Sequence, residues 1–382
     1  MALRWTVFLV LCLTFSLNKP CYGRAGRNIA CAAFSAEGAL ATATLKGNDL
    51  ETKLDSGGAV VTTHTSMDFM RGCEEGFSED GKWLVTVVPG NELNVIIHDR
   101  KTGQLYRRFS SPWRQLKNHP FEWSYESSFL GGFLQDDSLV LWRYVPRADP
   151  ASESSIDLHM ERWNVEGGLL SDLDLGDVGY ASGGRQPLAV IGLSMLWLPA
   201  RCSPSCFRGV KVSGSHIEDA GELKLPDDIA VEPIPLKSGQ GFLTVLGAQR
   251  TFQKATLLDA SGKLRKQVKL PAFPNLLGPL VPDWFYVREL EMSQDGELAA
   301  IARTRVAWVL VDTDRDWGSE IVILKTASFT VDTVLKTGKG GIQALAIDHR
   351  DGVIRLVGFW KGRWHDLKYD GDHPGRWQEN AG

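Results

Sequence analysis

The stretch GFSEDGKWLVTV, Gly76–Val87, places a Phe-Ser-x-Asp-Gly phrase directly before a run of apolar and β-branched residues. Glycine supplies the positive φ of a tight turn, and aspartate accepts hydrogen bonds from nearby turn amides. We therefore expect Phe77 to end an inner strand, Asp80 and Gly81 to reverse the chain, and the residues that follow to form a second strand. A single copy of this phrase would indicate one hairpin, whereas regular repeats of it would indicate the fold of the whole chain.

The phrase recurs along the chain. Clear copies lie at Ala33–Ala43 and Glu291–Ala302, and degenerate copies start at Phe133 and Ile347. A second kind of turn, an aspartate or polar residue followed by glycine at a strand end, alternates with the first. Its turn glycines are Gly57, Gly103, Gly167, Gly214, Gly262, Gly318 and Gly371, at intervals of 46 to 64 residues. Two hairpin turns and four short strands in each interval are typical of a propeller blade.

A four-stranded sheet cannot bury both faces alone, whereas sheets stacked around an axis bury each face against a neighbour. No segment shows sustained helical periodicity, and no Pro/Ser/Gly-rich linker separates the chain into tandem sandwiches. The sequence predicts an all-β, seven-bladed β-propeller, with six or eight blades as the alternative. The expected blades are 28–66, 67–117, 118–178, 179–225, 226–275, 276–330 and 331–378, and ring closure by strand exchange through residues 376–378, or through the residues before 28, stays open.

The segment NVIIHDRKTGQLYRRF, Asn94–Phe109, resembles the third strand, turn and fourth strand of a WD-repeat or YVTN-type β-propeller. The segment FSEDGKWLV, Phe77–Val85, resembles the first reversal of such a blade. The chain departs from true WD repeats because it has no Gly-His dipeptide and because His98 and Asp99 occupy the Trp-Asp position. The likeness is to irregular secreted bacterial propellers, and it implies a fold but no activity.

The N-terminus is typical of an export signal. Arg4 precedes the uncharged and largely apolar run Trp5–Leu17, and small residues follow at Gly23 and Ala25. This run is short for a membrane span. We expect residues 1–25 to be a signal peptide and residues 26–382 a single propeller domain, periplasmic or extracellular, with an uncleaved N-terminal anchor as the alternative. No later apolar run is long enough to cross a bilayer.

Export places the cysteines in an oxidising compartment. Removal of the leader takes Cys12 and Cys21 with it, which leaves four cysteines and three pairings. The sequence favours Cys31–Cys73, on inner strands of adjacent blades, together with Cys202–Cys206, a hairpin clip. Free thiols and a redox or zinc pair are the alternatives for the second pair.

The composition excludes some classes of function. A formal net charge of −4, with acidic and basic residues interspersed, argues against nucleic-acid binding. The chain has no G-x-S-x-G, H-E-x-x-H or phosphate-loop motif. Asp312, Asp314 and Asp316 alternate on an expected tight loop that could converge on calcium, and the segment Tyr369–Gly375 offers Asp370, Asp372 and His373, but neither meets the EF-hand pattern. No cofactor is expected, with calcium as a weak alternative.

An aromatic and polar segment, 110–128, joins the second and third expected blades. We expect it on a rim, where Trp113, Phe121, Trp123 and Tyr125 could bind a peptide or a sugar; packing between the two blades is the alternative. The sequence therefore favours an exported, non-catalytic protein- or ligand-binding scaffold of the cell envelope. A propeller hydrolase or lactonase with a central-channel site is the alternative function.

Overall fold

The fold is all-β. The computed structural model describes residues 29–46, 49–55, 60–64, 73–78, 80–89, 93–111, 130–133, 138–146, 156–177, 188–190, 195–199, 206–213, 216–226, 229–236, 241–247, 253–272, 283–309, 312–370 and 377–379. Within these ranges every regular element is a β-strand. The strands form seven antiparallel sheets of four, and each sheet takes four consecutive strands of the chain.

The strands are numbered along the chain, so the first sheet is β1 to β4 and the seventh is β25 to β28. The first four sheets consist of β1 (Ile29–Phe34), β2 (Leu40–Lys46), β3 (Asp49–Leu54) and β4 (Val60–His64); β5 (Glu74–Phe77), β6 (Trp83–Pro89), β7 (Leu93–Asp99) and β8 (Leu105–Ser111); β9 (Leu130–Phe133), β10 (Leu139–Pro146), β11 (Ile156–Trp163) and β12 (Leu169–Asp177); and β13 (Leu188–Val190), β14 (Met195–Pro199), β15 (Cys206–Ser213) and β16 (His216–Lys224).

The remaining three sheets follow the same order. They consist of β17 (Ile229–Pro235), β18 (Gly241–Leu246), β19 (Lys254–Asp259) and β20 (Leu264–Lys269); β21 (Asp283–Met292), β22 (Leu298–Val309), β23 (Asp312–Lys325) and β24 (Thr330–Gly338); and β25 (Ala344–Arg350), β26 (Val353–Trp360), β27 (Arg363–Asp370) and β28 (Trp377–Glu379).

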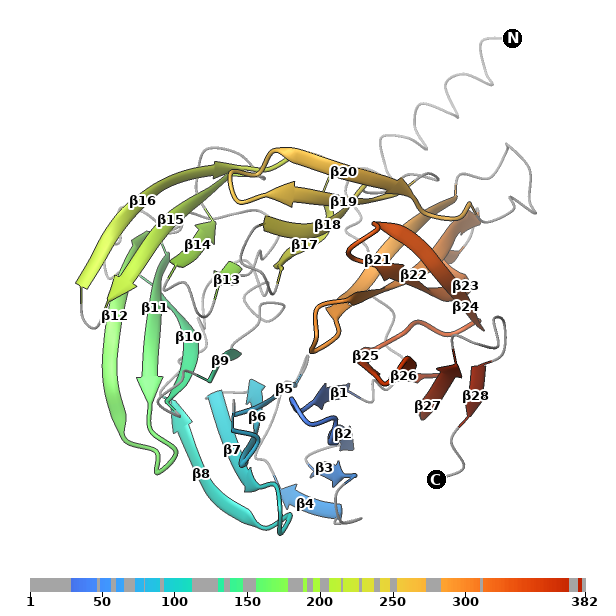
Figure 1. Cartoon of the computed structure of the whole chain (residues 1–382). Helices are drawn as coiled ribbons and strands as arrows, with labels where there is room; N and C mark the ends of the chain where they lie inside the picture. Colours follow the sequence, from blue (N-terminus) through green and yellow to red (C-terminus); the bar gives the residue numbers. More distant parts are fainter. Residues whose placement is uncertain are drawn as a thin grey trace, which may run out of the picture.

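The sheets are arranged around a common centre (Figure 1). The first strand of a sheet lies innermost, because first strands contact one another: β1 contacts β5 and β25, β5 contacts β9, β13 contacts β17, and β21 contacts β17 and β25. The fourth strand, such as β8, β12, β16 or β20, lies at the periphery (Figure 1). The first and seventh sheets are therefore neighbours in space although they are farthest apart in sequence.

The apolar core lies between the sheets, as this arrangement requires. Strand β6 illustrates the principle, because successive side chains of a strand point to opposite faces. Trp83 and Val85 pack against Leu139 of the third sheet, whereas Leu84 packs against Leu54 of the first sheet. Every described side chain of β6 from Trp83 to Val88 is buried, so this strand reads as a continuous apolar run and not as an alternating one.

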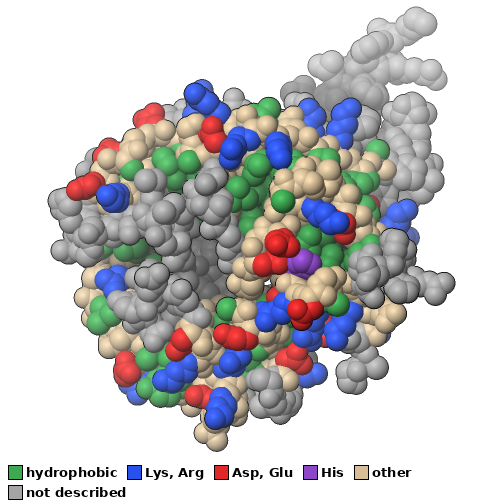
Figure 2. Space-filling model, in the orientation of Figure 1, with side chains coloured by type: hydrophobic (Ala, Val, Ile, Leu, Met, Phe, Trp, Pro, Cys, Tyr) green, Lys and Arg blue, Asp and Glu red, His purple; other side chains and the backbone are tan. Residues whose placement is uncertain are grey.

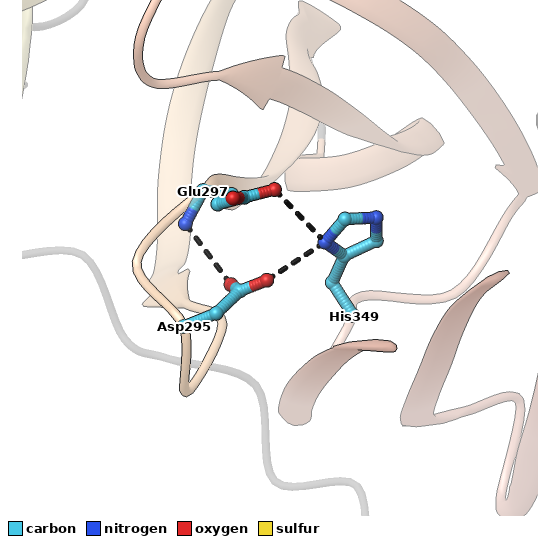
Figure 3. A group of neighbouring side chains, drawn as sticks. All are labelled: Asp295, Glu297 and His349. Atoms are coloured by element: carbon cyan, nitrogen blue, oxygen red, sulfur yellow. Dashed lines mark hydrogen bonds and ion pairs between the residues drawn. The ribbon is translucent and has the colours of Figure 1, made fainter. Parts of the chain in front are cut away.

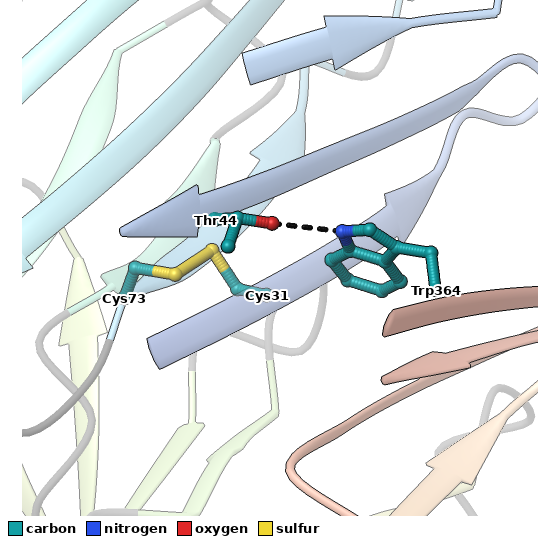
Figure 4. The surroundings of a disulfide bond; sticks show 4 residues. All are labelled: Cys31, Thr44, Cys73 and Trp364. Carbon is teal, nitrogen blue, oxygen red and sulfur yellow. Dashed lines mark hydrogen bonds between the residues drawn. A yellow bond between two sulfur atoms is a disulfide. The ribbon is translucent and has the colours of Figure 1, made fainter. Parts of the chain in front are cut away.

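Side chains join the seventh sheet to the first, an interface called the seam here. Trp364 Nε1 donates to Thr44 Oγ1 at 2.8 Å, and Arg355 Nη1 donates to Asp55 Oδ2 at 2.7 Å (Figure 4 shows the Trp364–Thr44 contact). Phe34 packs with residues of the seventh sheet in a shared apolar cluster. Residues 377–379 pair with β27, so the described part of this C-terminal segment stays in the seventh sheet and does not cross to the first.

A disulfide joins the first and second sheets. Cys31 on β1 and Cys73, the residue before β5, are bonded with their Cα atoms 5.6 Å apart (Figure 4). This is the pairing selected from the sequence. Cys31 is buried beside Ala43 and Ile96. Cys206 begins β15, while Cys202 lies outside the described residues, so the second expected pair stays a prediction.

The predicted turns are confirmed where the structure describes them, with one exception. Gly103, Gly167 and Gly262 have positive φ between the third and fourth strands of their sheets; Gly57, Gly214 and Gly371 lie outside the described residues. Gly318 was expected at a turn, and this is wrong, because it lies inside β23.

The sixth sheet has longer strands than the sequence indicated. Gly318 sits at a β-bulge, where Arg305 pairs with Gly318 and Val306 pairs with Asp316, and a bulge needs a permissive residue as much as a turn does. The turn itself follows Lys325 and contains Phe329 at φ 58°. The boundary expected at residue 330 is therefore wrong, since β24 completes the sixth sheet as far as Gly338.

Candidate functional site

The opening stretch forms a turn that is cross-braced by its serine and aspartate. Gly81 has φ 65°, and its amide donates to the Ser78 carbonyl. Ser78 Oγ donates to Asp80 Oδ1 at 2.6 Å and accepts from the Trp83 amide at 2.9 Å. The Lys82 amide also donates to Asp80 Oδ1. These hydrogen bonds lower the pKa of Asp80, that from Ser78 most, so the carboxylate is charged at neutral pH.

The turn between β21 and β22 repeats this geometry in the sixth sheet. Ser293 Oγ donates to Asp295 Oδ1 and accepts from the Leu298 amide at 3.0 Å. The Glu297 amide donates to the same Oδ1 at 3.0 Å. The turn thus occupies one oxygen of Asp295 and directs the other, Oδ2, away from the hairpin.

That second oxygen meets a side chain of the seventh sheet. His349, near the end of β25, places Nδ1 2.7 Å from Asp295 Oδ2 and 3.5 Å from Glu297 Oε2 (Figure 3). The three ligand atoms lie within 4.8 Å of one another, and among the described residues this is the one such group of three. The exposed fractions of the side chains are 21% for His349, 32% for Asp295 and 68% for Glu297.

Opposing effects act on the Asp295 carboxyl group. Partial burial opposes its ionisation, but the hydrogen bonds from Ser293, from the Glu297 amide and from His349 outweigh burial, so the pKa of Asp295 lies below its ordinary value. An anionic Asp295 can hold a protonated His349, or it can share a cation with a neutral one. Both arrangements use the same three side chains.

Neighbouring turns converge on the same region. Gln294 Nε2 donates to the Phe34 carbonyl of the first sheet at 2.9 Å. Arg350 Nη2 donates to the carbonyls of Ser35 and Ala36, at 3.1 and 2.6 Å. First-to-second-strand turns of the sixth, seventh and first sheets therefore lie side by side. On the face shown in Figure 2, acidic side chains and a histidine gather beside the centre of the ring among intermixed acidic and basic groups.

One carboxyl group of the inner strand β21 has a strongly perturbed pKa. Glu291 is half-buried as a residue, but its carboxyl is enclosed enough for desolvation to raise its pKa to about 7. Its strand leads directly into the turn that carries Asp295. Perturbed carboxyl groups are common at functional sites and also in structural cores, so Glu291 adds an inner-strand acid to this region without assigning a reaction.

The structure describes only part of the sites expected from the sequence. The aromatic rim residues Trp113, Phe121, Trp123 and Tyr125 lie outside the described residues, as do Asp372 and His373. The expectation of a tight acidic loop is wrong, because Asp312, Asp314 and Asp316 belong to strand β23, whose first residues pair with the end of β22. Asp370 is the last residue of β27.

Sequence reasoning missed His349 as a candidate ligand. The signal was present, since SQDGE at Ser293–Glu297 and DHRDG at Asp348–Gly352 are the turn phrases of consecutive repeats. Placing the histidine against the preceding carboxylates requires the stacking of the two sheets, which no local pattern contains.

Comparisons with known proteins support the fold. No protein-family model matches the chain, and no curated protein matches it. Among solved structures, it is similar to the β-propeller domain of Cps50 (Swd1) from Myceliophteria thermophila, with a TM-score of 0.50 and 13% identity over 91% of this chain and 98% of that one. No helix among the described residues is long and apolar enough to span a membrane. At this identity the likeness concerns the fold alone: the chain has an all-β architecture similar to a WD-repeat propeller.

Proposed function

We propose that this chain is an exported, seven-bladed β-propeller that acts as a non-catalytic protein-binding module of the cell envelope. The observation that carries the proposal is the arrangement of seven four-stranded sheets around one centre, with the first and last in contact. The similarity to a propeller domain supports the same architecture. Such a ring presents its connecting segments on two faces, where side chains from several sheets can meet one partner.

The disulfide supports the proposed location. Cys31–Cys73 links two sheets in the core, and structural disulfides persist in oxidising compartments. The apolar run Trp5–Leu17 supplies the matching export signal. Cleavage near residue 25 then leaves the described β1, which begins at Ile29, intact.

The proposed partner surface includes the aromatic segment between the second and third sheets. Trp113, Phe121, Trp123 and Tyr125 lie in a segment that joins the peripheral strand β8 to the inner strand β9. Aromatic side chains supply large contact areas at low entropic cost and are enriched among interface hot spots. A net charge of −4 favours a protein or peptide partner over a nucleic acid.

The test compares a double variant and a control variant with the wild type in the native host. Trp113→Ala with Trp123→Ala alters the aromatic segment, and Leu264→Ser on β20, where the side chain is 56% exposed, is the control at another exposed apolar position. Cross-linking of the tagged mature protein, followed by mass spectrometry, should capture one partner with wild type and control and lose it with the aromatic variant. Equal capture by all three proteins, or turnover of ester or lactone substrates by the wild type, would overturn the binding assignment.

Export has its own test. Full-length protein should appear in the periplasm or medium, shortened by about the 25 residues of the predicted signal. Replacing Leu9 and Leu11 by arginine should retain it in the cytoplasm at full length. A wild-type protein that stays uncleaved and cytoplasmic would contradict the proposed location and leave the fold untouched.

A further inference from the structure

The arrangement of Asp295, Glu297 and His349 differs from an ordinary ion pair by its second carboxylate. An imidazole Nδ1–H donates one hydrogen bond, yet here Nδ1 faces oxygens of two carboxylates, at 2.7 and 3.5 Å. A second histidine–carboxylate pair among the described residues, His159 and Asp172, allows a comparison. Its Nδ1–Oδ1 distance is also 2.7 Å, and the exposed fractions of the two side chains are 18% and 30%. Within the described part of the chain, that pair is not part of a group of three potential ligands.

The spacing suits a small divalent cation. Zinc binds imidazole nitrogen and carboxylate oxygen at about 2.0–2.2 Å in a tetrahedron, which sets neighbouring ligand atoms about 3.4 Å apart. The Nδ1–Oε2 separation of 3.5 Å already matches this value. The Nδ1–Oδ2 separation is the length of a hydrogen bond, so it has to open by under 1 Å when a metal replaces the proton.

Each ligand is placed so that it can make this adjustment. The turn fixes Asp295 by its other oxygen, while the largely exposed Glu297 side chain can reorient at little cost. With neutral His349 the three groups carry two negative charges, which a divalent cation compensates. The mixed nitrogen and oxygen ligands favour zinc over calcium or magnesium, which prefer oxygen alone.

We propose that Asp295, Glu297 and His349 bind a zinc ion that bridges the turns of the sixth and seventh sheets, with water in the remaining position. The site depends on the fold and on no part of the proposed binding role. An ion that bridges the two turns holds the sixth sheet against the seventh. This position lies beside the seam, where the described parts of the seventh and first sheets are joined by side-chain contacts instead of a shared strand.

The experiment uses the untagged mature chain, stripped with a chelator and exchanged into metal-free buffer. Isothermal titration with zinc chloride measures affinity and stoichiometry, and thermal melts follow stability with zinc and with calcium. Wild type should bind one zinc at this site and melt at higher temperature with zinc but not with calcium. His349→Ala and Glu297→Gln should each weaken that binding at least tenfold.

His159→Ala is the matched control, because His159 and Asp172 have the same Nδ1–carboxylate distance but, among the described residues, belong to no group of three potential ligands. It should bind zinc as wild type does. The proposal is overturned if wild type binds no zinc, if His349→Ala binds as well as wild type, or if His159→Ala loses as much affinity. Tryptophan fluorescence of the metal-free variants checks that each is folded, and Glu297→Gln, at an exposed position, preserves the test if His349→Ala is unfolded.

Discussion

Breaking the Cys31–Cys73 disulfide should lower the free energy of unfolding of the whole domain. The bond closes a loop with a sequence separation of 42 residues. In the chain-entropy model, a cross-link of this span removes conformational freedom from the unfolded chain worth about 4 kcal/mol at 25 °C. Spread over the unfolding entropy of the roughly 250 residues that the structure describes, this corresponds to a fall in Tm of about 8 °C.

Two perturbations separate the contribution of the cross-link to stability from the contribution of core packing. Reduction of the wild type with dithiothreitol opens the loop but keeps both sulfur atoms, whereas Cys31→Ala with Cys73→Ala also removes volume beside Ala43 and Ile96 in the core. Both should lower the free energy of unfolding by about the loop-closure amount, and the double variant should lose a little more.

Equilibrium unfolding in urea, followed by tryptophan fluorescence, measures the effect. Dithiothreitol should shift the wild type strongly and the double variant weakly, since any remaining shift in the variant belongs to the predicted Cys202–Cys206 pair. A wild-type midpoint that does not move on complete reduction, verified by thiol titration, would refute the argument that this bond stabilises the ring through loop closure.

Three further predictions concern buried charge and the seam. His98 is fully buried with neither ring nitrogen hydrogen-bonded among the described residues, and desolvation lowers its pKa to about 4 from 6.5. As the pH falls, the unfolded chain therefore takes up a proton at this histidine before the folded chain does. The free energy of unfolding should be fully retained above pH 7 and should fall by about 3 kcal/mol as the pH drops from 6.5 to 4. Urea unfolding at pH 7 and pH 4.5 should show that His98→Leu lacks this loss. Glu320→Gln should lower the free energy of unfolding, measured in urea, by about 3–5 kcal/mol. The reason is that it leaves the guanidinium of Arg303, whose side chain is 0% exposed, without its carboxylate partner. The double variant Arg303→Met with Glu320→Leu should lose much less. Asp55→Asn removes the seam contact to Arg355, and because Asp55 is 47% exposed, unfolding at low and high salt should show a loss below about 1 kcal/mol that salt reduces.

Local chemistry made the hairpins predictable. Gly81 and Gly103 both adopt positive φ, and the aspartates beside them accept turn amides, as with Thr102 to Asp99 at 2.8 Å. These features depend on residues within a few positions of one another, so they are visible in a single sequence. Their repetition at intervals of 46 to 64 residues then predicted the strands and most sheet boundaries.

The error in the sixth sheet shows the limit of that approach. A glycine at a bulge and a glycine at a turn satisfy the same backbone demand, so Gly318 carried no sign that β23 continues for seven more residues to Lys325. Pairing with β22 and β24 decides the outcome, and pairing is a property of three strands together.

The candidate site was beyond local reasoning for a related reason. His349 and Asp295 are separated by 54 residues, and each belongs to a turn that looks unremarkable by itself. Their meeting depends on how far the seventh sheet is displaced along the sixth. The Cys31–Cys73 contact was easier to anticipate, because both cysteines occupy equivalent places in adjacent repeats and thiols have few other roles in an oxidising compartment.

The absence of a shared strand between the described parts of the first and seventh sheets has an evolutionary consequence. Each sheet is encoded by one uninterrupted piece of sequence, so duplication or loss of a single piece alters the size of the wheel without leaving any sheet half-built. After such a change, only the packing between the two sheets that have become neighbours must be restored. Genes of this kind can therefore drift in copy number and in order while every surviving module keeps its own hydrogen bonds.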